Sequence, residues 1–214
     1  MLKAVAVELK NHAPYTLLGA LSGIILMAAL LLSHAPPASL KPVFESFHAV
    51  HILLSAIVTT ALYRRYRSSV VGAILVGFTG AVGVATLSDV IFPHHGGVFL
   101  LAVTGSEHTM HHIHLAFIEK WWIINPVALL GVGFGLARPH TKLPHAGHVL
   151  LSTWASLFYL VSHAELGTNW LPRAPLVLIV LFVAVWVPCC FSDIAWPMVL
   201  VGKDPDEIAE EEHA

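Results

Sequence analysis

The chain has 214 residues, of which 57% are hydrophobic and only 11% are charged, and its formal net charge is −2. This composition excludes a soluble globular domain, in which about a quarter of the residues are charged, and it leaves no basic surface for nucleic acid. We therefore expect an integral membrane protein, with the lipid bilayer as its main partner. Its 15 histidines outnumber its 11 lysines and arginines. Because histidine is the commonest metal ligand, this excess calls for a chemical explanation.

The first half of the chain holds three predicted transmembrane spans, since a span needs about 20 mainly apolar residues. Residues 14–32 form the first, although their basic start and the small residues after them also suit a cleaved signal peptide. The second ends at Tyr63, before three arginines, and reaches spanning length only if His48 and His51 lie inside it. The third covers about 69–92 and ends at the following proline, and its glycines offer surfaces for close helix contact.

The second half holds three more predicted spans. A histidine-rich connection, residues 94–116, precedes them, and we expect it to lie at the surface or to re-enter the membrane. The fourth span covers 121–137, the fifth begins at Pro144, which is a favoured first helical position, and the sixth covers about 174–197. The acidic tail, residues 204–214, is expected to be disordered.

The two halves share sequence motifs, which indicates a duplicated unit. H-A-V-H-I-L-L-S at 48–55 returns as H-A-G-H-V-L-L-S at 145–152, and S-D-x-x-x-P occurs at 88–93 and again at 192–197. Because each unit holds an odd number of spans, the second unit must be upside down relative to the first, as in many transporters. We therefore predict an all-α bundle of six transmembrane helices built as two inverted three-helix repeats. The two repeats cover residues 1–93 and 117–203, and the Leu-Leu-Gly triplets at 17–19 and 129–131 echo each other.

The distribution of positive charge predicts the orientation. Eight of the 11 lysines and arginines face the cytoplasm if the N-terminus does, and three face the outside. We therefore expect both termini to be cytoplasmic, in the cytoplasmic membrane of a bacterium or an archaeon. The sequence is also compatible with a homo-oligomer.

Two pairs of histidines are the first candidate ligands. His48 and His51 are three residues apart on a predicted helix, so they project from one face, and His145 and His148 repeat this spacing. Each pair lies near the start of its helix, where the helix dipole disfavours added positive charge and favours the neutral imidazole that binds metals. The alternative is that each histidine forms a hydrogen bond to a neighbouring helix.

Asp89 and Asp193 are the second kind of candidate ligand. An ionised carboxylate inside a span is costly, and each of these lies near a helix C-terminus, where a nearby cation would compensate the charge. A proline four residues later lacks the N–H that would bond the aspartate carbonyl, which leaves a second oxygen available. The alternative is that each aspartate is an N-cap or forms a structural pair with a buried histidine. As ligands, the aspartates predict two pseudo-equivalent sites, with a single midplane site as the rival arrangement. The outer site contains His48, His51 and Asp89, and the inner site contains His145, His148 and Asp193, to which Cys189 and Cys190 add soft ligands.

The connection between the halves carries a further string, H-x-x-H-H, formed by His108, His111 and His112. This string resembles one histidine box of the membrane fatty-acid desaturases and hydroxylases, and the resemblance implies ligands to a pair of irons. It covers five residues, and no second H-x-x-H-H occurs in the chain. We interpret the string as a solvated loop that collects metal ions.

These patterns predict binding and translocation of a divalent transition metal rather than an enzyme. Zinc or iron is favoured over copper, because the chain has only 4 methionines. Two other classes remain open. One is a membrane-embedded metal or haem oxidoreductase, since four histidines on two helices can bracket a non-covalent haem. The other is a sensor or assembly factor that does not transport.

Overall fold

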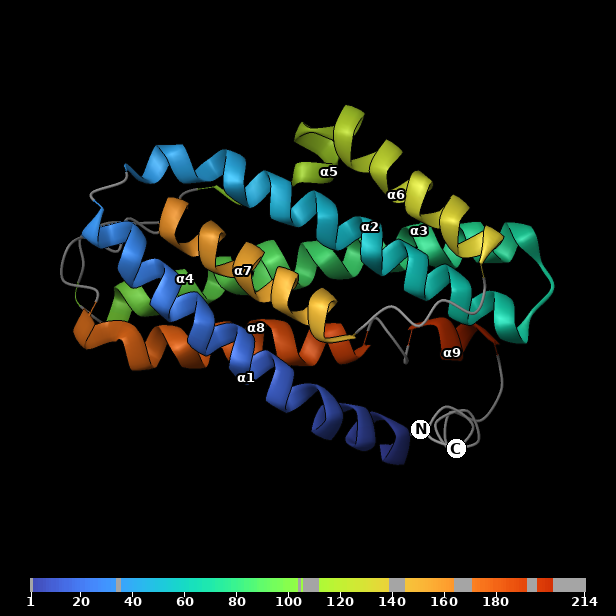
Figure 1. The fold of residues 1–214 in the computed structure, drawn as a ribbon, viewed down its shortest axis with the longest axis horizontal. Coiled ribbons are helices and arrows are strands. Elements are labelled where there is room, and N and C mark those ends of the chain that lie inside the picture. Colours follow the sequence, from blue (N-terminus) through green and yellow to red (C-terminus); the bar gives the residue numbers. More distant parts are fainter. Residues whose placement is uncertain are drawn as a thin grey trace.

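In the computed structural model most of the described residues are helical and no strand occurs among them, in agreement with the predicted all-α class (Figure 1). The described residues are 2–33, 36–103, 105, 112–138, 145–163, 171–191 and 196–201. The longer helices are α1 (Leu2–Leu32), α2 (Lys41–Tyr66), α3 (Val70–Thr86), α4 (Phe92–Val103), α6 (Trp121–Ala137), α7 (His145–His163) and α8 (Ala174–Cys190). The shorter elements are η1 (Pro37–Leu40), η2 (Leu87–Ile91), α5 (Ala116–Glu119), η3 (Leu171–Arg173) and α9 (Trp196–Val201).

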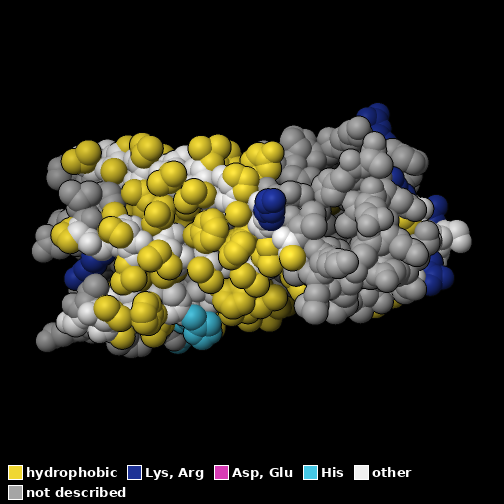
Figure 2. Space-filling model, turned by 90° about the horizontal axis from the view of Figure 1, so that it is seen from below, with side chains coloured by type: hydrophobic (Ala, Val, Ile, Leu, Met, Phe, Trp, Pro, Cys, Tyr) yellow, Lys and Arg dark blue, Asp and Glu magenta, His cyan; other side chains and the backbone are white. Residues whose placement is uncertain are grey.

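Three helical stretches are long and apolar enough to cross a membrane, and this is consistent with a membrane protein. They are His12–Leu30, Lys41–Tyr66 and Val70–Val103. Two shorter apolar helices, Trp121–Ala137 and Ala174–Cys189, accompany them. Many large apolar side chains of α1 and α8 point outward, as Ile25 does with 71% of its surface exposed. On the face drawn in Figure 2 hydrophobic side chains cover much of the described surface, beside a few lysine or arginine side chains and one histidine, and such a surface suits contact with lipid tails.

The helix ends follow from local sequence. The second helix includes His48 and His51, as predicted, and its last turn carries Arg64 and Arg65, whose positive charge suits a helix C-terminus. The side chain of Ser69 caps α3 by accepting a hydrogen bond from the backbone N–H of Gly72. The predicted fourth span coincides with α6. In contrast, α1 begins at Leu2, twelve residues before its predicted start at residue 14.

The predicted end of the third span at Pro93 is wrong, because the helix continues through this proline to Val103. The segment η2 just before it is one turn of π-helix, in which the N–H of Phe92 bonds to the carbonyl of Leu87, five residues earlier. A proline disrupts a regular α-helix because it lacks an N–H and its ring clashes with the preceding turn. The wider π turn accommodates these constraints and lets the helix pass.

Close contacts with glycine hold α3 against α2. A Cβ atom on Gly77 would collide with the side chain of Thr60, and one on Gly80 would lie 3.0 Å from the Cγ2 of Thr59. These glycines therefore act as the small contact surfaces that the sequence predicts. Gly83 does not, because no atom lies within 4 Å of the place its Cβ would occupy.

The order of contacts along the helices gives their directions. Phe44 of α2 contacts Tyr159 of α7, and His51 of α2 contacts His148, so these two helices run antiparallel. We call the end of the bundle that carries Arg64, Arg65 and Arg67 the arginine end, on the right in Figure 1. The opposite end, which carries His94, His114 and His163, is the histidine end.

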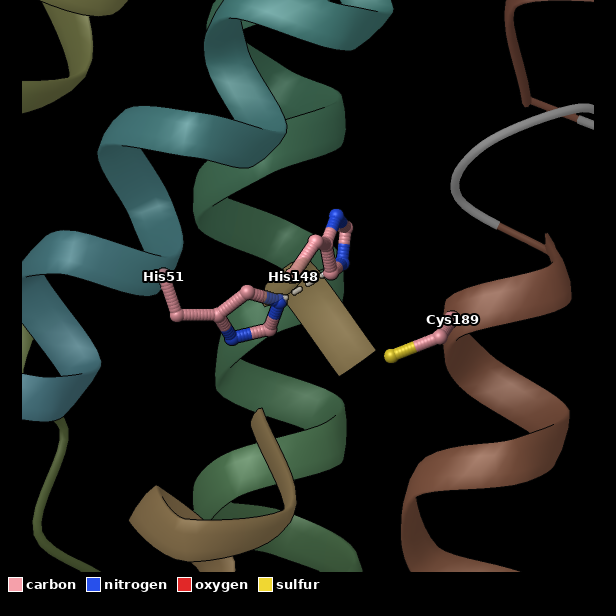
Figure 3. Close-up of side chains that lie close together, drawn as sticks. All are labelled: His51, His148 and Cys189. Atoms are coloured by element: carbon pink, nitrogen blue, oxygen red, sulfur yellow. Dashed lines mark hydrogen bonds between the residues drawn. The ribbon is translucent and has the colours of Figure 1, made fainter. Parts of the chain in front are cut away.

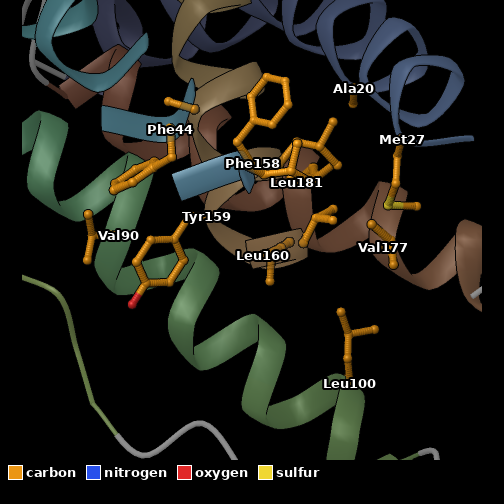
Figure 4. Close-up of a cluster of buried hydrophobic side chains, with 14 residues drawn as sticks. Ala20, Met27, Phe44, Val90, Leu100, Phe158, Tyr159, Leu160, Val177 and Leu181 are labelled. Atoms are coloured by element: carbon orange, nitrogen blue, oxygen red, sulfur yellow. The ribbon is translucent and has the colours of Figure 1, made fainter. Parts of the chain in front are cut away.

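The two largest hydrophobic clusters of the described residues fill most of the interior. The larger one joins α1, α2, α7 and α8 in the half of the bundle that contains the histidine end, with Phe44, Tyr159 and Leu181 among its members (Figure 4). The second joins α2, α3 and α6 in the other half and includes Ile52 and Ala85. The buried residues Asp89 and His48 lie between these clusters. Asp89 is one helical turn from Ala85 of the second cluster, and His48 is one turn from Phe44 of the first.

Candidate metal centre

Asp89 is fully buried and forms hydrogen bonds through both of its carboxylate oxygens. Its Oδ2 accepts from Nδ1 of His48 at 2.9 Å and from Nδ1 of His51 at 2.7 Å. Its Oδ1 accepts from the hydroxyls of Ser88 at 2.7 Å and Ser152 at 2.8 Å. The predicted contact between the first histidine pair and Asp89 is therefore present. Four donors stabilise the buried carboxylate, which compensates the cost of its burial without a cation.

The hydrogen bonds to Asp89 fix which nitrogen of each histidine is available. A carboxylate only accepts, so Nδ1 of both His48 and His51 carries the proton. In a neutral imidazole the other nitrogen, Nε2, then presents a lone pair. Asp89 thus orients two imidazoles for binding, as carboxylates do behind the histidine ligands of many metal sites. The Nε2 of His48 is buried and has no hydrogen-bond partner among the residues that the structure describes.

The π turn and its proline explain a second contact at this place. In the π register Pro93 would bond to the carbonyl of Ser88, five residues earlier, but proline has no N–H. The hydroxyl of Ser156 takes that role, and its single proton is shared between this carbonyl at 2.9 Å and the carbonyl of Ser152 at 2.8 Å. The sequence predicts that Pro93 leaves the carbonyl of Asp89, four residues earlier, without an N–H donor. Because of the π turn, the carbonyl that lacks this donor is that of Ser88, five residues earlier.

His148 joins the same centre from α7 (Figure 3). Its Nε2 lies 2.9 Å from the Nε2 of His51, and the two rings are tilted by 60° with centroids 4.6 Å apart. Because His51 presents a lone pair there, His148 donates the proton that joins the two rings. Two ligands of one zinc ion at about 2.0–2.1 Å would place these nitrogens roughly 3.3 Å apart in tetrahedral geometry. A small outward movement of the rings is enough to replace the shared proton by a metal ion.

Cys189 of α8 completes a group of three potential ligands. Its sulfur lies with the ring nitrogens of His51 and His148 in a set whose ligand atoms are all within 4.8 Å of one another. All three side chains are buried, and the sulfur points toward the two rings in Figure 3. The sulfur also lies 3.6 Å from the hydroxyl of Ser152, which links it to the hydrogen bonds around Asp89.

The prediction of two separate sites is wrong for His148, because this residue shares a centre with His51. The reason is the antiparallel crossing of α2 and α7, which brings the two repeated motifs together at one depth. The position of Asp193, the side chain of His145, and the predicted ligands His108 and His111 lie outside the described residues. His112 is described and is exposed.

Three serines of the centre were missed by the sequence reasoning. Ser88 and Ser152 bond to the carboxylate of Asp89, and Ser156 bonds to the backbone beside it. A signal for two of them was present in the repeats, because Ser152 ends the H-A-x-H-x-L-L-S motif and Ser88 begins S-D-x-x-x-P. No such motif marks Ser156.

A series of stacked rings extends from the centre to the histidine end. Phe44 stacks on His48 with centroids 5.4 Å apart and meets the ring of Tyr159 edge-on at 5.3 Å. Tyr159 stacks on His163 at 4.4 Å, and its hydroxyl lies 3.3 Å from Nδ1 of His94. The series reaches the surface where His163 stacks on His114. His114 in turn pairs with the half-exposed Glu119.

Comparison of the chain with protein-family models, with curated proteins and with solved structures gives no match.

Proposed function

We propose that this chain is an integral membrane protein that binds a divalent transition-metal ion between its two halves and carries it across the membrane. The observation that carries the proposal is the buried group of His51, His148 and Cys189. Histidine and cysteine are the ligands preferred by borderline metals, and two imidazoles with a thiolate suit zinc first and iron second. A fourth position is left for water, or for the unpartnered Nε2 of His48 after a small shift.

In this proposal Asp89 positions the ligands and does not bind the ion itself, because protein donors already occupy both of its oxygens. It keeps the imidazoles in the tautomer that offers Nε2 to a metal. This division of roles differs from the sequence hypothesis, which made Asp89 a direct ligand.

The inverted repeat is part of the proposal, and matched contacts between the halves support it. A Cβ on Gly19 would meet the Oγ1 of Thr153 at 2.8 Å, and a Cβ on Gly131 would meet the Cβ of Ala56 at 2.8 Å. Gly19 and Gly131 end the two Leu-Leu-Gly triplets, and Ala56 and Thr153 each follow a copy of the duplicated histidine motif directly. The contact between α1 and α7 thus corresponds to the contact between α6 and α2.

The centre itself lies where such a symmetry would place it. His51 and His148 occupy the same position of the two motifs, and they contact each other. A pair of equivalent residues in contact lies on the axis that relates two halves. Transporters built from inverted repeats bind their substrate at this interface and expose it to either side by rocking one half against the other. The orientation with both termini in the cytoplasm places the arginine end on the cytoplasmic side, following the positive-inside rule.

The haem alternative finds no support in the distances. Axial ligands on opposite faces of a haem iron stand roughly 4 Å apart, twice a metal–nitrogen bond of about 2 Å. The Nε2 atoms of His51 and His148 are only 2.9 Å apart.

The test is metal binding by the purified full chain, measured by elemental analysis and by titration with Zn²⁺ and Co²⁺. We expect one ion per chain, and a thiolate-to-cobalt charge-transfer band that is lost in Cys189→Ser. His51→Gln and His148→Gln should each abolish tight binding, whereas His163→Gln, which alters a ring at the histidine end, should not. A chain that binds no metal, or that binds it equally well in all these variants, would overturn the proposal.

A further inference from the structure

Glu119 holds the ring of His114 at the histidine end of the bundle. Its Oε2 accepts a hydrogen bond from Nδ1 of His114 at 2.5 Å, and its Oε1 accepts from the backbone N–H of Leu115 at 3.1 Å. Because a carboxylate only accepts, Nδ1 of His114 carries the proton and Nε2 presents a lone pair in the neutral ring. The side chains of His114 and Glu119 are 20% and 48% exposed, so this pair lies at the surface of the protein.

His163, the last residue of α7, is held in the same tautomer by its own helix. Its Nδ1 lies 3.0 Å from the carbonyl oxygen of Tyr159, which only accepts, so this nitrogen carries the proton. The hydroxyl of Ser162 lies 2.8 Å from the same nitrogen, but it donates its own proton to the carbonyl of Phe158 at 2.6 Å. The Nε2 of His163 therefore presents a lone pair. Stacking on Tyr159, with centroids 4.4 Å apart, limits the rotation of the ring.

The rings of His114 and His163 have a separation that suits two ligands of one ion. Their centroids are 6.1 Å apart and their planes are inclined by 25°. A zinc ion about 2.0–2.1 Å from a ring nitrogen lies roughly 3.2 Å from the centroid of that ring. Two imidazoles on one ion therefore have centroids about 5.2 Å apart in tetrahedral geometry and about 6.4 Å apart at the widest angle. Among the described residues, the hydrogen bonds of both rings use Nδ1, so neither occupies Nε2.

This pair of rings resembles the buried centre in its chemistry and differs from it in access. In both places a carboxylate accepts from Nδ1 of a histidine and so turns Nε2 toward a ligand. His51 and His148 are enclosed by helices, whereas His114 is partly exposed. Two protein ligands leave further positions of a tetrahedral ion to water. An ion held in this way binds more weakly than in the buried group of three ligands.

We propose that Nε2 of His114 and Nε2 of His163 form a second metal site, which takes a partly hydrated divalent transition-metal ion, zinc first, at the histidine end. Glu119 positions His114 and does not bind the ion. A small rotation of the partly exposed His114 ring directs both nitrogens to the ion, and water completes the coordination. Binding here does not depend on the buried centre. Under the proposed function, this site collects the ion on the side opposite the arginine end.

Zinc titration of the full chain against a competing chelator tests the site. We expect a weaker class of one zinc ion per chain beside the tight class of the buried centre. His114→Gln and His163→Gln should each remove the weaker class and leave the tight class unchanged. His95→Gln is the matched control, because His95 is also exposed near this end but its ring contacts His94. A weaker class that survives both substitutions, or that is lost equally in the control, would overturn the proposal.

Glu119→Gln tests the positioning role. The amide oxygen can still accept from the N–H of Leu115, but the second oxygen that holds His114 is lost. We expect the affinity of the weaker class to fall about tenfold, as when a carboxylate behind a histidine ligand is removed. The tight class and the unfolding temperature should not change. Glu45→Gln is the control, because Glu45 pairs with Lys120 at 3.6 Å and not with a histidine.

Modification of histidines by diethyl pyrocarbonate reads the same site in the wild-type chain. Zinc in excess of the tight class should slow the modification of His114 and His163 several-fold and leave His95 unaffected. Equal slowing at all three residues, or slowing at none, would contradict the site. A chain without tight binding but with protection of His114 and His163 would remove the proposed function and leave this site supported. Tight binding without that protection would do the reverse.

Discussion

Packing is matched between the two halves of the chain, whereas hydrogen bonding is not. The contacts of Gly19 with Thr153 and of Gly131 with Ala56 correspond residue by residue. Hydrogen bonding differs at the corresponding positions Ser156 and Thr59, because the hydroxyl of Ser156 bonds to the carbonyl of Ser88 whereas the Oγ1 of Thr59 has no partner among the described residues. This difference indicates that the α7 side of the centre is a fixed framework that orients the ligands.

Asp89→Asn should disrupt the hydrogen-bonded framework around the carboxylate, and we expect from it the largest loss of stability. The amide N–H groups would face hydrogen-bond donors and leave buried polar groups unsatisfied, which costs about 1–3 kcal/mol for each such group. Glu45→Gln is the control, because Glu45 forms a half-exposed pair with Lys120 at 3.6 Å, of the kind that contributes less than about 1 kcal/mol. Unfolding of both variants in the same detergent gives the comparison. Equal stability would mean that Asp89 does not organise the centre.

His148→Gln tests whether the two halves share one centre. The substitution removes one of two imidazoles whose nitrogens are 2.9 Å apart, and we expect a loss of zinc affinity of about 100-fold, or roughly 2.7 kcal/mol. Under two independent sites, half of the bound zinc would keep its full affinity. Elemental analysis at saturating and at limiting zinc distinguishes these results, with His94→Gln as a buried histidine outside the group.

Gly19→Ala and Gly131→Ala test whether the two matched helix contacts contribute equally to stability. At either position a Cβ would lie within 2.8 Å of a neighbouring side chain, and at Gly131 it would also lie 2.6 Å from the carbonyl oxygen of Leu53. Overpacking of this kind costs about 1–3 kcal/mol. Gly133→Ala is the control, because nothing lies within 4 Å of that position. Destabilisation by Gly131→Ala alone would show that the matched contacts are not energetically equivalent.

Much of this architecture could be predicted because it depends on local sequence. The length of apolar sequence before Arg64 places His48 and His51 inside α2, and the helix ends around α6 follow from charged residues. The proximity of the first histidine pair to Asp89 follows from the duplicated motifs. Each of these results needs only the length of a span and the spacing of residues on a helix.

Two features of the centre could not be predicted, because they depend on packing between helices. A proline normally marks a helix end, and nothing in the residues before Pro93 distinguishes an end from a π turn that lets the helix pass. The contact of His51 with His148 depends on the depth at which α2 crosses α7. The spacing of the motif residues does not encode that depth, so the motif alone favours two sites.

The smallest effect is expected from Pro93→Ala, which tests whether the π turn before this proline positions Asp89. Alanine restores an N–H at position 93 that can compete with Ser156 for the carbonyl of Ser88. The π turn would then tend toward a regular helix, which rotates Asp89 relative to the two histidines. We expect zinc affinity to fall three- to fivefold, about 1 kcal/mol or less, without loss of folding.

Pro14→Ala is the control for this last substitution, because Pro14 also lies inside a helix but on an exposed part of α1. Ser156→Ala should reduce affinity by a similar factor if its hydroxyl and the missing N–H act together. In that case the double variant should be less affected than the sum of the two changes, because both alter the same carbonyl. Additive losses would mean that Ser156 and Pro93 influence the centre independently, and the π turn would then owe its position to the packing of α4 against α7 and α8.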